Sequence, residues 1–134
     1  MRHALSLLAF AFLVFTAQSG EAVEGLHTYD SMKDDTQELA SQYPDIAIYS
    51  EQGMSTGLDL EIFSVDVALN ITELTDEELN ALPTMYVDGT HHGNEGMSAE
   101  ASFLFLQDVL ERSAADPSYL EGKRLVVTPS VNPD

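Results

Sequence analysis

The stretch Thr84–Gly96 reads TMYVDGTHHGNEG and is the most informative part of the sequence for predicting the fold. Its first four residues favour a short buried strand, and a polar loop with glycine follows at once. From Met97 to Arg112, apolar residues recur at helical spacing. Residues 125–127 (LVV) then read as another buried strand. Strand, loop, helix and strand in this order predict a βαβ unit with two parallel strands.

The residues before this unit predict a helix, a hairpin and a second, shorter helix. Helical spacing indicates a helix over 29–43, which Thr28 can cap and Pro44 ends. Predicted strands over 46–49 and 58–67 flank turn glycines, which is typical of a hairpin. A short helix over 76–82 follows, which Thr75 caps and Pro83 ends. Helices and strands therefore alternate, and the chain is predicted to be α/β.

Composition limits what the chain can do. Its 134 residues fit one domain, with 23 Asp and Glu against 5 Lys and Arg and a net charge of −18. This acidity argues against a nucleic-acid surface and against binding to anionic lipid headgroups. The absence of cysteine excludes disulfides, thiolate zinc ligands and a cysteine nucleophile. Metal ligands must therefore be His and carboxylate side chains.

Residues 1–20 predict a secretory signal peptide, with a positive start, an apolar run over 4–15 and small polar residues after it. The run has twelve residues, which is short for the ~20 that span a bilayer. An uncleaved anchor is the alternative. We expect cleavage near Ser19 or Gly20, a secreted protein without stable membrane association, and one unit over 21–134 with net charge −19.

The predicted site lies at the carboxyl ends of the parallel strands, where open α/β sheets place their sites. The loop after Val87 and the segment after Val127 both emerge at this edge. In that loop His92 and Glu95 are three residues apart, and imidazole and carboxylate are ligands that suit zinc. The bare spacing is common by chance, and a catalytic zinc typically needs three protein ligands and a water.

A family resemblance gives this pair its context. Residues 83–95 (PTMYVDGTHHGNE) closely resemble the first zinc-binding motif of the metallocarboxypeptidases, the zinc carboxypeptidase or peptidase M14 family. Residues 27–44 and 53–57 resemble the family's amino-terminal helix and the turn after it, and 128–134 (TPSVNPD) resemble its next landmark. The resemblance implies a three-layer α/β/α fold with a mixed sheet, of which 21–134 form an incomplete amino-terminal part.

Carried over by position, the resemblance makes His92 and Glu95 the first two ligands of one Zn²⁺ ion. His91 is a neighbour that could replace His92 if the loop register differed by one. Asp88 and Asn94 are candidates for orienting the ligands, although a plain turn role fits them equally.

The implied reaction is metal-assisted hydrolysis of C-terminal peptide bonds, with peptide or protein C-termini as partners. In the family the third ligand, the general base and the residues that grip the substrate carboxylate follow the Asn132–Asp134 landmark. The landmark itself would give structural support. We therefore expect no catalytic residue in this chain, leave its substrate-binding residues unknown, and predict an inactive part of a larger enzyme. Leu58 departs from the family, which often has Arg there.

Other residues do not complete the site. His27 heads the first helix, and Glu100 points about 140° away from Glu95 around a helix. Lys123 and Arg124 precede a strand and so belong to the opposite edge. We also expect the strand over 125–127 to be an unpaired or half-covered edge.

Three hypotheses follow. The first is part of a secreted zinc metallocarboxypeptidase. The second is a zinc amidohydrolase of the aspartoacylase or succinylglutamate-desuccinylase type, which shares the His-x-x-Glu pair. The third is a non-catalytic secreted module that binds peptide.

Overall fold

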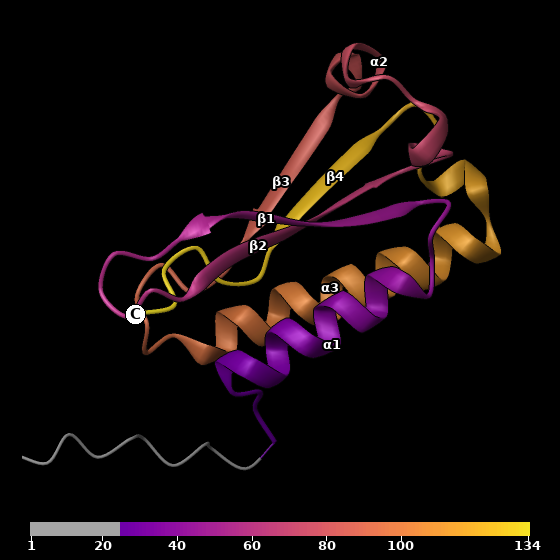
Figure 1. The fold of residues 1–134 in the computed structure, drawn as a ribbon. Coiled ribbons are helices and arrows are strands. Elements are labelled where there is room, and N and C mark those ends of the chain that lie inside the picture. The colour runs from indigo at the N-terminus through magenta and orange to yellow at the C-terminus, as the bar shows by residue number, and fades with distance from the viewer. Residues whose placement is uncertain (1–24) are drawn as a thin grey trace, which may run out of the picture.

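The computed structural model describes residues 25–134, and the predicted signal peptide over 1–20 lies outside the described residues. The elements are α1 (Tyr29–Ser41), β1 (Ala47–Met54), β2 (Glu61–Ala68), α2 (Asp76–Ala81), β3 (Thr84–Asp88), α3 (Gly96–Ala115) and β4 (Arg124–Thr128), with short 3₁₀ turns at Ile71–Glu73 and Pro117–Tyr119. Their order is the predicted one (Figure 1). Within the described range, no helix has both the length and the apolar character that a bilayer crossing requires.

The four strands form one mixed sheet in the order β1-β2-β4-β3. β2 pairs antiparallel with β1 and with β4, and β3 pairs parallel with β4. The predicted α/β class, the hairpin and the βαβ unit are therefore confirmed. The expectation that the strand over 125–127 is an edge is wrong, because Val127 lies between Val65 and Val87. β4, in which Leu125, Val127 and Thr128 are buried, has partners on both sides, and the more exposed β3 forms the edge.

The two long helices lie side by side on one face of the sheet (Figure 1). The core between them and the sheet is aliphatic and aromatic, and its fully buried members are Phe63, Val65, Val67, Leu106, Leu110 and Val127. On the opposite face Ile48 and Tyr86 are exposed. Of the three layers that the resemblance implies, the described residues thus form a sheet and one helical layer.

Both predicted helix caps are confirmed, and each is a capping box. Thr28 and Ser31 hydrogen-bond reciprocally at the start of α1, and Thr75 and Glu78 do so at the start of α2. Such caps satisfy amide groups that a helix start leaves without partners. The helix boundaries are therefore fixed by local sequence.

Glu61 links α1 to the hairpin of β1 and β2 through an ion pair and hydrogen bonds. Its buried carboxylate forms an ion pair with Lys33 of α1 and accepts a hydrogen bond from the Tyr49 hydroxyl (2.7 Å). The Tyr29 hydroxyl donates to the Glu61 carbonyl (2.8 Å). Burial alone would raise the pKa of Glu61, but the hydrogen bonds from Lys33 and Tyr49 lower it. The carboxylate therefore stays ionised among partners that stabilise its charge.

His27 links the segment before α1 to α3 through hydrogen bonds and ring packing. Its Nδ1 lies 2.8 and 2.9 Å from the two carboxylate oxygens of Glu100, and its Nε2 lies 3.0 Å from Asp35 Oδ2. The ring also packs against Phe103, with centroids 5.0 Å apart. Burial alone would lower the pKa of His27, but hydrogen bonds and charge attraction from Glu100 and Asp35 raise it above 6.5.

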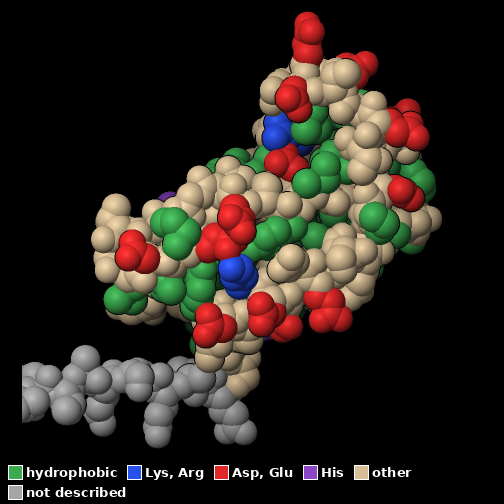
Figure 2. Space-filling model, in the orientation of Figure 1, with side chains coloured by type: hydrophobic (Ala, Val, Ile, Leu, Met, Phe, Trp, Pro, Cys, Tyr) green, Lys and Arg blue, Asp and Glu red, His purple; other side chains and the backbone are tan. Residues whose placement is uncertain are grey.

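The charge of the described surface is predominantly acidic. Figure 2 shows Asp and Glu side chains spread over the visible face, with few Lys or Arg among them. The mutual repulsion of these dispersed carboxylates is screened by salt.

The raised pKa of His27 predicts a pH-dependent contribution to stability. The protonated ring stabilises the fold fully below its unfolded pKa of about 6.5, and this contribution is lost as pH rises through the raised folded pKa. We expect His27→Gln to lower stability by on the order of 1 kcal/mol at pH 5.5 and by less at pH 9. Thermal unfolding across this range measures the difference.

The matched control for that experiment is His91→Gln, because His91 is exposed and forms an ion pair only with Asp88 within residues 25–134. Its unfolding midpoint should stay close to that of the unsubstituted chain at each pH. A His27→Gln deficit of the same size at every pH would contradict the role of His27 protonation.

Candidate metal site

The loop over 89–95 joins the carboxyl end of β3 to the start of α3. The segment after β4 runs beside it, since the Val131 amide donates to the Gly89 carbonyl (3.1 Å) and the Asn132 amide donates to the Thr90 carbonyl (3.0 Å). The two segments that the sequence placed at one sheet edge are therefore in contact. This edge carries the predicted site.

His92 and Glu95 lie together in this loop. His92 Nδ1 is 2.8 Å from Glu95 Oε1, and the His92 amide donates to Glu95 Oε2 (3.2 Å). Glu95 stands just before α3, and its amide donates to the His92 carbonyl (2.9 Å). A tight turn, rather than one face of a helix, therefore brings the two side chains together.

The electrostatics of the pair suit a cation. Hydrogen bonds from the His92 ring and backbone lower the pKa of Glu95, so its carboxylate is ionised at neutral pH. The side chains are 76% and 43% exposed, so an incoming ion can reach them from solvent.

The donor set fits part of a zinc centre. Imidazole nitrogen and carboxylate oxygen bind zinc at about 2.1 Å, and two tetrahedral ligands then lie about 3.4 Å apart. The 2.8 Å separation here needs only a small opening of two exposed side chains. Within residues 25–134, no group of three or more His, Asp or Glu side chains is placed to hold a metal ion. The described residues therefore offer two candidate ligands, which is fewer than a complete centre needs.

The predicted supporting residues have different surroundings. His91 Nε2 lies 3.4 Å from Asp88 Oδ2, so Asp88 faces His91 rather than the His92–Glu95 pair. Asn94 is exposed in the same turn. Neither position shows a contact that orients a ligand.

The cationic residues near β4 lie at the opposite edge, as predicted. Arg124, at the amino end of β4, donates to Asp66 (2.5 Å) and to Asn80 (2.9 Å). Lys123 donates to the Tyr119 carbonyl (3.1 Å). These residues therefore support the far end of the sheet.

The close packing around Gly89, where the loop leaves β3, could not be predicted from the sequence. A Cβ atom on Gly89 would lie 2.5 Å from the Pro129 carbonyl oxygen and 2.6 Å from both Ser102 Oγ and the Ser98 carbonyl oxygen. Thr90 adopts a left-handed backbone (φ 47°), and its amide donates to Ser98 Oγ (2.7 Å). Only the small residues at 98 and 102, four apart on α3, hinted at this close approach.

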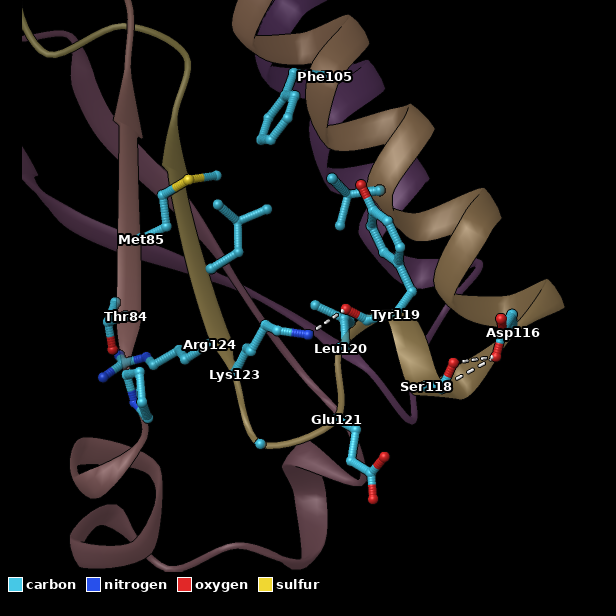
Figure 3. A pocket seen from close by; sticks show the side chains of 14 residues that line it. Thr84, Met85, Phe105, Asp116, Ser118, Tyr119, Leu120, Glu121, Lys123 and Arg124 are labelled. Atoms are coloured by element: carbon cyan, nitrogen blue, oxygen red, sulfur yellow. Dashed lines mark hydrogen bonds between the residues drawn. The ribbon is translucent and has the colours of Figure 1, made fainter.

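A large hollow among the described residues lies elsewhere. It measures about 950 Å³ and lies between β3, β4, α3 and the turn after α3 (Figure 3). Its lining is mostly apolar and includes Met85, Phe105, Val109, Tyr119, Leu120 and Leu125. Figure 3 shows Met85, Phe105 and Tyr119 directed into the space between the edge strand and the helix. The lining offers packing surface, and the ligand pair is not part of it.

Gly89→Ala is predicted to destabilise the fold, because the added methyl group meets two carbonyl oxygens at less than 3 Å. We expect a loss of about 1–3 kcal/mol, measured by chemical unfolding. The matched control is Gly96→Ala at the start of α3, where the nearest atom to the new methyl group is Leu26 Cδ1 at 3.8 Å. That variant should be neutral or slightly stabilising. Equal stability of the two variants would contradict the crowding at Gly89.

Comparison with known proteins shows a matching family and solved structures with a similar fold. A family model described as zinc carboxypeptidase matches residues 32–134. The carboxypeptidase A from Helicoverpa armigera superimposes with a TM-score of 0.65 at 21% identity, covering 81% of this chain and 25% of that one. Comparison with curated proteins gives no match.

Thrombin-activatable fibrinolysis inhibitor has a similar fold in two structures. One structure gives a TM-score of 0.67 at 19% identity, over 81% of this chain and 26% of that one. The bovine protein, in complex with tick carboxypeptidase inhibitor, gives 0.63 at 17% identity, over 81% and 32%. This chain thus spans between 25% and 32% of the solved structures it resembles. With the family model matched over residues 32–134, the chain belongs to the zinc carboxypeptidase family.

Proposed function

We propose that His92 and Glu95 are two of the ligands of one Zn²⁺ ion in a metallocarboxypeptidase that hydrolyses C-terminal peptide bonds of peptides or proteins. The observation that carries this proposal is the 2.8 Å approach of His92 Nδ1 to Glu95 Oε1 at the carboxyl end of β3, in a chain of this family. When bound, zinc supplies Lewis acidity for the scissile carbonyl and for a water molecule.

The role of the described residues is to hold and present the metal. The ionised Glu95 carboxylate adds negative charge to the site, and the turn before α3 fixes its distance from His92. The third ligand, the general base and the residues that bind the substrate carboxylate are proposed to follow Asp134 in the complete enzyme. The chain of 134 residues is therefore expected to be inactive alone.

The exposed surface of β3, the edge strand, supports the proposal that these residues are part of a larger domain. β3 pairs with β4 and with no other strand among the described residues. Met85 and Tyr86 of β3 are 52% and 55% exposed, one on each face, and Met85 borders the apolar hollow. Unpaired backbone and exposed apolar side chains are features that a further strand and helix would cover. We propose that the rest of the catalytic domain packs here.

Export is part of the proposal. A signal peptide over 1–20 would deliver the enzyme to the extracellular space, without stable membrane association after cleavage. The dispersed acidic surface agrees with an exported protein in a salt-containing medium (Figure 2).

The family match favours the carboxypeptidase over the amidohydrolase. The family match covers most of the chain and is to zinc carboxypeptidases rather than to aspartoacylase-type amidohydrolases. A non-catalytic peptide-binding module remains the alternative, and the continuation of the reading frame after Asp134 distinguishes it from an enzyme.

Zinc titration of the 134-residue chain tests the ligand pair. We expect weak binding, because only two ligands are present, and a loss of at least tenfold in affinity in His92→Ala and in Glu95→Ala. His91→Ala is the control and should retain the affinity of the unsubstituted chain. Tight stoichiometric binding, or binding indifferent to both ligand substitutions, would overturn the assignment.

Extension of the chain tests the larger domain. We expect amide groups on the outer side of β3 to exchange with solvent at least tenfold more slowly in a chain extended beyond Asp134, because a new strand would pair with them. The extended chain with zinc should also release the last residue of a peptide with a free C-terminus. A stop codon after Asp134, together with a soluble monomeric product, would favour the non-catalytic module.

A further inference from the structure

The hydrogen-bond ladder between β3 and β4 continues beyond the ends of both strands. The Gly89 amide donates to the Thr128 carbonyl (3.0 Å), and the Val131 amide donates back to the Gly89 carbonyl (3.1 Å). One residue further, the Asn132 amide donates to the Thr90 carbonyl (3.0 Å). The segment after β4 therefore runs beside the first residues of the loop over 89–95 and pairs with them in succession.

Proline interrupts this ladder at its next step. Residue 133 is Pro, which has no amide hydrogen to donate. The Asn132 side chain supplies the next donor instead, and its Nδ2 lies 2.9 Å from the His91 carbonyl oxygen. The carbonyl groups of Gly89, Thr90 and His91 are thus held in succession, and Asn132 holds the last two.

The loop needs this restraint because its backbone is strained. Thr90 is β-branched, 5% exposed and in the left-handed region at φ 47°. Such a conformation is unfavourable for a β-branched residue and persists only where neighbouring contacts enforce it. Here the contacts come from Ser98 Oγ, which accepts the Thr90 amide, and from the Asn132 amide, which holds the Thr90 carbonyl.

We propose that Asn132 is a positioning residue, whose side-chain amide fixes the His91 carbonyl and thereby aims His92 at Glu95. The His91 carbonyl belongs to the peptide unit that ends at the His92 nitrogen, so holding it sets the direction in which the chain enters His92. The inference rests on the proposed zinc role of His92 and Glu95.

The chemistry of the contact requires a donor at position 132. The partner is a carbonyl oxygen, so an amide nitrogen satisfies it, whereas a carboxylate of the same shape would place an acceptor against an acceptor. Asn132 is itself exposed, so the bond contributes only modestly to overall stability. Its effect on ligand geometry should exceed its effect on folding.

Two substitutions in the 134-residue chain separate these roles. Asn132→Asp keeps the shape and removes the donor, and Asn132→Ala removes the side chain. Asn80→Ala is the matched control, because it also deletes one side-chain hydrogen bond, to Arg124, at the opposite edge of the sheet. For each chain, thermal unfolding reports the fold, and a titration with Zn²⁺ alone, followed at the NMR signals of the His92 ring, reports the metal.

We expect both Asn132 variants to fold and to lose about tenfold in zinc affinity, as outer hydrogen-bond partners of metal ligands typically cause. Asn80→Ala should keep the affinity of the unsubstituted chain. If the unsubstituted chain binds zinc through His92 and both Asn132 variants bind equally well, the positioning role is wrong. It is also wrong if neither variant folds, or if Asn80→Ala loses as much affinity.

Failure of the proposed function has a different signature. In that case the His92 ring signals of the unsubstituted chain do not respond to zinc, and His92→Ala changes nothing. The behaviour of the unsubstituted chain therefore decides the ligand assignment before the Asn132 variants are compared.

Discussion

The pairing of β4 on both of its sides is the constraint on which the rest of the structure depends. Val127 is fully buried between Val65 of β2 and Val87 of β3, so one strand joins the amino-terminal hairpin to the βαβ unit. The parallel half of this pairing brings the carboxyl ends of β3 and β4 to one edge. Without it, the loop that carries His92 would have no neighbouring segment to hold it.

Much of the fold could be predicted because its signals are local. The reciprocal caps at Thr28 and Thr75 each depend on residues three apart, and the helical spacing between Met97 and Arg112 marks α3. The proximity of His92 and Glu95 could also be predicted from the sequence, because a turn of four residues keeps its ends close.

The features that escaped prediction depend on contacts between distant residues. The interior place of β4 follows from its pairing with β2, which lies some sixty residues earlier in the chain. The contact between His27 and Glu100 joins residues 73 positions apart and has no counterpart in any local pattern. Likewise, the crowding at Gly89 arises from packing between Pro129 and α3, at which only the small residues at 98 and 102 hint.

The exposed edge of β3 has a consequence for the order of folding. The described residues already enclose an apolar core, so within the larger domain proposed above they would form their sheet without waiting for residues that follow. The open edge of β3 would then be the template on which any further strand assembles. Until such a strand pairs with it, the same edge is open to pairing with a neighbouring molecule, so prompt pairing would protect the protein from aggregation.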